Sequence, residues 1–146
     1  MFIPVLISLA VIVATIFMHG VGAAWGLGYL TRRHEDRELD PGFRRSLRIL
    51  SSAAVFLMLL HFLEIALWAG VYLAIPQIDK LSHWEEAIYF STVTYTTLGY
   101  GDITLDPVWR VMSGFEAMDG ILLFGWTTAM FYAVVQKIVA NKNSTG

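Results

Sequence analysis

The sequence predicts an all-α membrane protein in which three helices cross the bilayer and a shorter fourth helix enters it without crossing. Three observations lead to this fold class. Hydrophobic residues make up 56% of the 146 residues, more than in an ordinary soluble domain. Three apolar runs are each long enough to cross the roughly 30 Å hydrocarbon core as helices. A polar, glycine-containing segment interrupts the chain between the second and third runs.

The composition also excludes several classes of function. The chain has no cysteine, so disulfides, thiol chemistry and zinc ribbons are excluded. Its net charge of −2 gives no electrostatic reason to bind nucleic acid. The four histidines lack the spacing of common metal motifs, and no catalytic triad spacing or phosphate-binding loop is evident. We therefore expect neither an enzyme nor a protein that carries a cofactor.

The first run, residues 1–30, is predicted to be an N-terminal transmembrane helix. It contains no Asp, Glu, Lys or Arg, and a helix of this length reaches roughly 45 Å. A secretory signal peptide is the alternative, but it would begin with basic residues and have a shorter apolar core. Gly22 and Gly26 form a GxxxG pattern, which allows helices to approach closely, although loose packing of small residues is the interpretation that the sequence favours. His19 has no evident partner, and we interpret it as a packing residue.

The second run covers residues 47–75 and ends before Pro76, and the third covers residues 108–140. Both are long enough to span the bilayer. Aromatic residues near the predicted span ends are interpreted as a belt at the membrane surface. They are Trp25, Tyr29, Trp68, Tyr72, Trp84 and Trp109.

The distribution of basic residues predicts the orientation of the spans. Residues 31–48 hold six arginines, whereas Lys80 and Arg110 are the only basic residues between the second and third runs. Short loops rich in Arg and Lys stay in the cytoplasm. The predicted topology has the N-terminus outside, the Arg-rich loop of residues 31–46 in the cytoplasm, residues 76–107 outside, and the tail of residues 141–146 in the cytoplasm.

Residues 83–96 are predicted to form a helix that enters the membrane and does not cross it. The segment is amphipathic and too short to span the bilayer. Ser82, with Glu85 three residues later, is a candidate capping box at its start. The chain then passes through TTLGYGD and returns toward the third run. Irregular backbone at membrane depth is tolerated only where it is buried in protein or lines water, so this heptad is a candidate functional segment.

The hexapeptide Thr97-Leu98-Gly99-Tyr100-Gly101-Asp102 follows a short helix and lies between two spanning helices. In this context it resembles the pore signature of the potassium channel superfamily, and the resemblance covers residues 50–138. The chain is similar to bacterial two-helix pore-loop channels, with an additional N-terminal transmembrane helix. The resemblance implies a homotetramer around a central pore, with a pore domain at residues 47–140. Its implied parts are an outer helix 47–75, a pore helix 83–96, a filter 97–102 and an inner helix 108–140.

A potassium filter replaces the water shell of the ion with rings of backbone carbonyls. The resemblance assigns these rings to residues 97–100, with the Thr97 hydroxyl innermost, and places Gly101 and Asp102 at the outer mouth. Gly99 and Gly101 permit positive φ, so successive carbonyls can all turn toward the axis while the intervening Leu and Tyr side chains pack behind them. The C-terminal end of the pore helix favours a cation.

The chain departs from the superfamily pattern in several respects. Many members have Trp-Trp where this chain has Tyr89-Phe90, and an indole of that pair donates to the filter aspartate. Phe90 cannot donate, so we expect Tyr89 or Tyr95 to hold Asp102 instead. Leu98 stands where valine is frequent, and its side chain is expected to point away from the axis. None of the spans carries the regularly repeated arginines of a voltage sensor.

Four ionisable side chains lie within the second and third runs, at similar depth beside or just below the filter. They are His61, Glu64, Glu116 and Asp119. Two interpretations stay open: in one, Asp119 faces the cavity and concentrates K⁺, and His61 with Glu64 senses pH. In the other, the acids support the pore helix through hydrogen bonds. Gly120 is a candidate hinge, and helix packing is the alternative explanation for it.

The resemblance implies a passive, K⁺-selective channel in a bacterial inner or plasma membrane. Its expected partners are membrane lipid, K⁺ ions and further copies of the chain. A weakly selective cation channel is one alternative, and a non-conducting accessory membrane protein is another. The sequence does not indicate the gating stimulus.

Overall fold

The computed structural model describes residues 2–35 and 43–143, and within them the ordered structure is helical without any strand. The predicted all-α fold class is therefore confirmed for these residues. Within the described residues, four α-helices and one short 3₁₀ helix follow one another. They are α1 (Phe2–Glu35), α2 (Phe43–Leu73), η1 (Asp79–Leu81), α3 (Trp84–Tyr95) and α4 (Val111–Asn143).

Three of these helices are long and apolar enough to cross a membrane, which agrees with the three predicted spans. Their apolar stretches are Phe2–Gly26, Ser46–Leu73 and Val111–Ala140. Each helix is longer than its apolar stretch. The extra residues are mostly polar and continue α1 to Glu35, begin α2 at Phe43 and continue α4 to Asn143. Part of the predicted Arg-rich loop is therefore helical. Residues 36–42 of that loop and residues 144–146 of the predicted tail lie outside the described residues.

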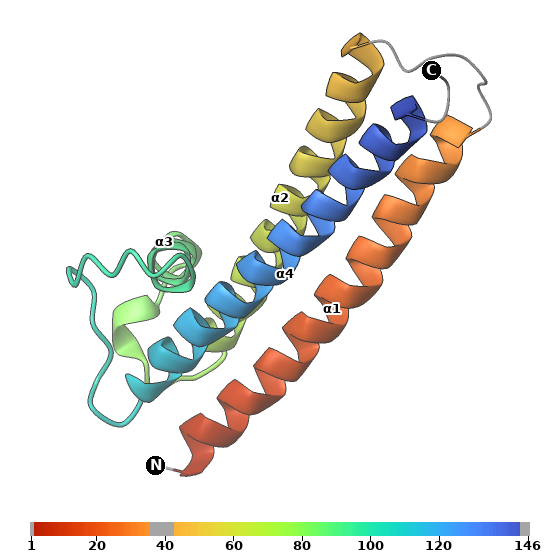
Figure 1. The fold of residues 1–146 in the computed structure, drawn as a ribbon. Coiled ribbons are helices and arrows are strands. Elements are labelled where there is room, and N and C mark those ends of the chain that lie inside the picture. The colour runs from red at the N-terminus through yellow and green to blue at the C-terminus, as the bar shows by residue number, and fades with distance from the viewer. Residues whose placement is uncertain (1, 36–42, 144–146) are drawn as a thin grey trace.

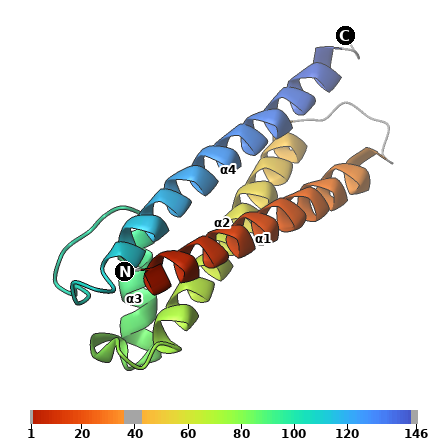
Figure 2. The ribbon, with the colours of Figure 1, turned by 90° about the horizontal axis from the view of Figure 1, so that it is seen from below.

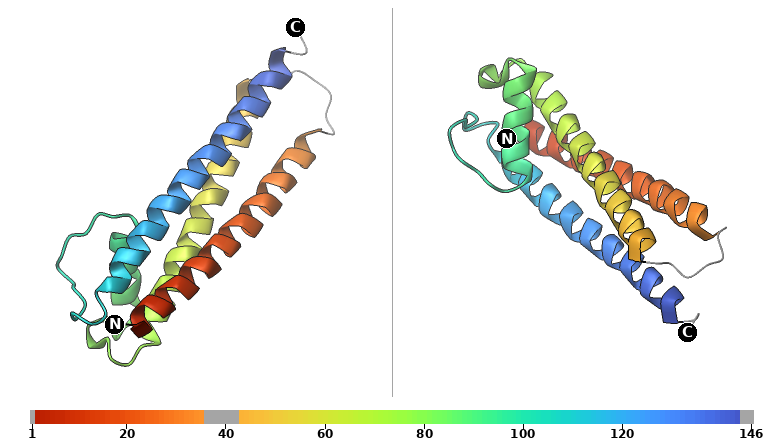
Figure 3. Two further views of the ribbon diagram at one scale, coloured as in Figure 1. Left: turned by 60° about the horizontal axis from the view of Figure 1, so that its bottom comes forward. Right: turned by 90° about the horizontal axis from the view of Figure 1, so that it is seen from above.

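The three long helices lie side by side, and α2 runs antiparallel to α1 and α4 (Figure 1). The short helix α3 packs against α2 and α4 near one end of this bundle, and its axis crosses theirs (Figures 1 and 2). The end of α1, the start of α2 and the end of α4 lie together at the opposite end (Figures 1 and 3). The N-terminus and the segment between α2 and α4 thus share one side of the bundle, and which side faces the cytoplasm stays a prediction.

Small residues bring α1 close to α2. A Cβ atom added to Gly22 would lie 2.8 Å from a Leu60 methyl carbon, and one added to Gly26 would overlap the Phe56 ring. Both contacts are too short for carbon atoms, so a larger residue at either position would push the Leu60 or Phe56 side chain aside. Both glycines of the GxxxG pattern therefore lie at the contact between α1 and α2, closer to it than the loose packing that the sequence favoured.

The start of α3 corrects one sequence prediction. The N-cap is His83, whose backbone N–H donates to the Glu86 carboxylate over 3.2 Å, so the predicted pair Ser82 and Glu85 is wrong by one residue. Ser82 ends η1 with a helical backbone, φ −83° and ψ −19°, whereas His83 is extended, φ −116° and ψ 150°. An N-cap residue needs the extended conformation. Ser82 cannot adopt it, because it has the helical backbone conformation at the end of η1.

Candidate functional site

The heptad highlighted in the sequence begins where α3 ends. Beyond Tyr95, the backbone N–H groups of Thr96 and Thr97 donate to the carbonyls of Thr92 and Thr94 over 3.1 and 2.9 Å. The Gly99 N–H returns to the Val93 carbonyl over 3.1 Å. These bonds hold residues 97–102, hereafter the filter segment, against the C-terminal turn of α3.

The backbone of the filter segment alternates in conformation from residue to residue. Thr97, Gly99 and Gly101 have φ angles of 61°, 57° and 79°, and no other described residue outside the glycines has positive φ. An alternation in the sign of φ turns successive peptide carbonyls toward the same side of the chain. The predicted positive φ at both glycines is confirmed. Thr97 was not expected to share it, because a left-handed conformation costs a non-glycine residue roughly 1–2 kcal/mol.

The filter segment is open to its surroundings in the single chain. Leu98 is 56% exposed and Tyr100 is 67% exposed. We expected these side chains to pack behind the backbone, but their own subunit does not cover them. Any packing behind the segment has to come from another molecule.

A tyrosine of α3 holds the aspartate at the end of the filter segment. The Tyr89 hydroxyl donates to the Asp102 carboxylate over 2.6 Å. This hydrogen bond holds the pKa of Asp102 below its ordinary value and raises the pKa of Tyr89. Of the two candidates named from the sequence, Tyr89 is therefore the donor to Asp102. The Tyr95 hydroxyl donates to Glu64 instead.

Two carboxylates of α4 are buried against the other helices. Glu116 accepts hydrogen bonds from the Tyr72 hydroxyl of α2, over 2.7 Å, and from the Ser91 hydroxyl of α3. Asp119 accepts from the Trp68 indole N–H over 2.9 Å and pairs with the Thr15 hydroxyl of α1 over 2.7 Å. Asp119 is 1% exposed. These contacts favour the supporting role of the acids over a cavity-facing Asp119.

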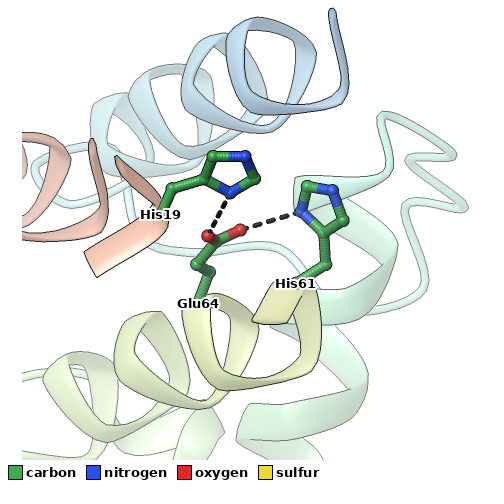
Figure 4. Close-up of side chains that lie close together, drawn as sticks. All are labelled: His19, His61 and Glu64. Atoms are coloured by element: carbon green, nitrogen blue, oxygen red, sulfur yellow. Dashed lines mark hydrogen bonds and ion pairs between the residues drawn. The ribbon is translucent and has the colours of Figure 1, made fainter. Parts of the chain in front are cut away.

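Glu64 of α2 is the third buried carboxylate, and it connects α1 to α3. Its two oxygens lie 2.8 Å from His19 Nδ1 and 2.8 Å from His61 Nδ1 (Figure 4). The Tyr95 hydroxyl donates to it over 2.6 Å. The interpretation of His19 as a packing residue is therefore wrong, because its imidazole is hydrogen-bonded and fully buried. His19, His61 and Glu64, hereafter the His–Glu cluster, also have the donor types and the spacing that a metal ion would need.

Gly120 lies where α4 meets the end of α3. A Cβ atom added there would overlap the backbone carbonyl oxygen of Tyr95. This contact supplies a packing reason for the glycine, and its role as a hinge stays a prediction.

Several supporting residues were missed from the sequence. Trp68 and Tyr72 were assigned to the aromatic belt, but both are fully buried as donors to the α4 carboxylates. A signal for this was present, since positions four apart lie on one face of a helix. Glu116 and Asp119, three positions apart, also share one face of α4. Nothing in the sequence could have ruled out the lipid-facing alternative.

Removing the Glu116 carboxylate is expected to destabilise the fold. In Glu116→Ala, Ser91 keeps the Ile65 carbonyl as an acceptor at 3.1 Å, whereas the Tyr72 hydroxyl loses its acceptor. The orphaned hydroxyl and the lost side-chain volume should lower the free energy of unfolding by about 2–4 kcal/mol. Glu116→Gln retains an acceptor and should lose at most about 1 kcal/mol. Thermal unfolding in detergent measures both.

The exposed acid Glu85 of α3 provides the matched control for this prediction. Glu85→Ala removes a carboxylate that lies at the surface, so its unfolding should match the wild type. A Glu116→Ala variant as stable as Glu85→Ala would show that the buried hydrogen bonds at Glu116 contribute nothing.

A short helix between two spanning helices, followed by a polar segment held at its C-terminal end, defines a pore-loop membrane protein. A family model described as "Ion channel" matches residues 49–137, more than half of the sequence. The chain therefore belongs to this family of two-helix pore-loop channels, and the resemblance noted in its sequence is confirmed. Membership points to a channel rather than an enzyme. In the comparisons with curated proteins and with solved structures, nothing matches the chain.

Proposed function

We propose that the protein is a passive, K⁺-selective channel and that residues 97–100 form its selectivity filter. The observation that carries the proposal is the alternating backbone of the TTLGYGD segment, with positive φ at Thr97, Gly99 and Gly101. Carbonyls that face one side replace the hydration shell of K⁺ when several chains present them to a common axis. The end of α3 points its negative dipole at the same region, which further favours a cation.

The same geometry requires several copies of the chain. One filter segment supplies only one side of each carbonyl ring, so four copies around an axis complete it. The exposed apolar side chains support this assembly. Leu98, Tyr100 and part of the apolar surface of α4 are not buried by any other part of the same chain. The exposed α4 residues are Met118, Ile121 and Leu122. In the assembly, these surfaces face neighbouring copies or the pore.

The proposed orientation places the filter segment at the outer side of a bacterial inner or plasma membrane. The arginines near the end of α1 and the start of α2 lie at the opposite end of the bundle from α3 (Figure 1). Because basic residues stay in the cytoplasm, the N-terminus and the filter segment are outside and the C-terminus is inside. Glu64 and Glu116 then act as supports that hold α3 between the spanning helices, and Asp119 joins α4 to α1 and α2.

Reversal potentials of the purified protein in planar bilayers test the proposal. In mixed K⁺ and Na⁺ solutions, with more K⁺ on one side and more Na⁺ on the other, we expect the current to reverse close to the K⁺ equilibrium potential. A reversal near zero would replace the proposal with a weakly selective cation channel. An absence of rubidium uptake into liposomes that contain the folded protein would instead identify a non-conducting accessory protein.

The Tyr89–Asp102 hydrogen bond is expected to set the acid sensitivity of the outer mouth. The pKa of Asp102 is lowered, so above that pKa the aspartate is ionised and accepts the hydrogen bond from Tyr89. The charged form is lost as the external pH falls through that pKa. Tyr89→Phe removes the donor and returns the pKa toward its ordinary value of 3.8. The acid-induced change in current should therefore begin at a higher external pH in the variant, as bilayer recordings would show.

Tyr132→Phe is the control for this experiment, since Tyr132 is an exposed tyrosine of α4 far from Asp102 in the sequence. Its acid response should follow the wild type. If Tyr89→Phe followed it as well, the hydrogen bond would have no influence on the charge of Asp102 at the mouth.

A further inference from the structure

The His–Glu cluster lies where α1 meets the part of the chain that matches the channel family. His19 comes from α1, outside the matched residues, and His61 and Glu64 come from α2 (Figure 4). Their candidate ligand atoms all lie within 4.8 Å of one another. His19 and Glu64 are fully buried and His61 is 4% exposed.

We propose that this cluster is a binding site for a divalent transition-metal ion, with Zn²⁺ as the expected occupant. Two imidazole nitrogens and one carboxylate oxygen are a ligand set that suits Zn²⁺. Ca²⁺ and Mg²⁺ prefer oxygen ligands alone. The Tyr95 hydroxyl lies 2.6 Å from the Glu64 carboxylate and 3.1 Å from His61 Nδ1, so a fourth oxygen is close to the three candidate ligands.

A cation between the two rings and Glu64 matches the hydrogen-bond partners of the cluster. Both Nδ1 atoms face Glu64, and both Nε2 atoms face the Thr127 hydroxyl, His61 at 2.8 Å and His19 at 3.3 Å. With two neutral rings that carry hydrogen on Nδ1, the single hydroxyl hydrogen of Thr127 satisfies only one Nε2 atom. With hydrogen on both Nε2 atoms, Thr127 accepts from both rings, but two nitrogen lone pairs then face the carboxylate.

A metal ion resolves the second arrangement. Both Nδ1 lone pairs and the Glu64 carboxylate then bind the ion, while each Nε2–H donates to Thr127 and fixes the orientation of its ring. Metal-ligating histidines use their second nitrogen in this way. Asp119, which interacts electrostatically with Glu64 and His19 and has one buried oxygen without a partner in the described residues, helps to balance the charge of the ion.

Binding of the ion couples α1 to the filter support. Ligand atoms around a tetrahedral Zn²⁺ lie about 3.3 Å apart, whereas the two nitrogens lie 2.8 Å from the carboxylate here. The ion therefore moves His19, and α1 with it, slightly away from α2. Because Tyr95 is the last residue of α3 and bonds to Glu64, the same ion acts on a residue two positions before the filter segment.

Metal titration of the purified full-length protein tests the proposal. After treatment with a chelator, Zn²⁺ is titrated in a calorimeter, and Co²⁺ is added separately to record its visible d–d absorption. We expect one ion per chain and a four-coordinate Co²⁺ spectrum. His19→Gln, which retains a side chain able to bond Glu64, and Glu64→Gln should each weaken binding at least tenfold.

His83→Gln, at the exposed start of α3, should leave the affinity unchanged. Gel filtration and thermal unfolding establish that the variants are folded, and Zn²⁺ should raise the unfolding temperature of the wild type but not of His19→Gln. Wild-type protein that binds no Zn²⁺, or His19→Gln that binds it as tightly as the wild type, would show that a proton alone supplies the positive charge. The assay needs no current, so its outcome is independent of the proposed K⁺ selectivity.

Discussion

Replacing Gly99 with alanine is expected to abolish K⁺ conduction while the chain still inserts into the membrane. Gly99 has a φ of 57°, and a Cβ atom added there meets no atom of the chain within 4 Å. The effect therefore arises from the backbone, because the left-handed conformation costs an alanine roughly 1–2 kcal/mol. The chain relieves this cost when the peptide rotates, which turns a carbonyl away from the axis and breaks one ring of ligands. Bilayer recording of the purified variant measures the loss.

Gly70→Ala is the matched control for this variant. Gly70 lies within α2, also has no neighbour within 4 Å of an added Cβ, and does not have positive φ. Its current should equal that of the wild type. Normal current in Gly99→Ala would remove the reason for assigning ion coordination to the carbonyls of the filter segment.

Replacing Gly120 with alanine is expected to disrupt both the fold and conduction. The added methyl group would overlap the Tyr95 carbonyl oxygen, and a backbone atom cannot move aside as the end of a flexible side chain can. Either α3 or α4 has to shift, at a cost of about 1–3 kcal/mol. A shift of α3 also moves the filter segment bonded to it. Thermal unfolding in detergent and bilayer recording measure the two effects.

Gly125→Ala, on the same helix, separates the contact from a general effect of alanine. Nothing lies within 4 Å of an added Cβ at Gly125, so the substitution should stabilise the helix by about 0.5–1 kcal/mol. Equal stability of the two variants would contradict the packing role of Gly120. A Gly120→Ala variant with wild-type stability and altered gating would support the hinge interpretation instead.

Much of the fold could be predicted because its causes are local in the sequence. The three spans follow from the lengths of the apolar runs, and the positive φ of Gly99 and Gly101 follows from the residue type and the motif. Tyr89 could be named as a donor to Asp102 because Phe90 beside it has no polar atom. Each of these predictions depends on neighbouring residues, or on a motif whose geometry repeats wherever it occurs.

The supporting contacts could not be predicted because they join residues far apart in the chain. His19 bonds Glu64 across 45 positions, and Thr15 bonds Asp119 across 104. A histidine or threonine in an apolar run fits either packing or hydrogen bonding until its neighbour on the next helix is known. Trp68 shows the same limit, since an aromatic residue near a span end suits the membrane surface as well as a buried carboxylate.

The measurement that tests the central claim most directly is a structure of the assembled protein with Tl⁺ in place of K⁺, located by its anomalous scattering. We predict that Tl⁺ lies on a fourfold axis, between successive rings of the backbone oxygens of residues 97–100. Tl⁺ absent from that axis, or those oxygens turned toward protein or lipid, would contradict the account.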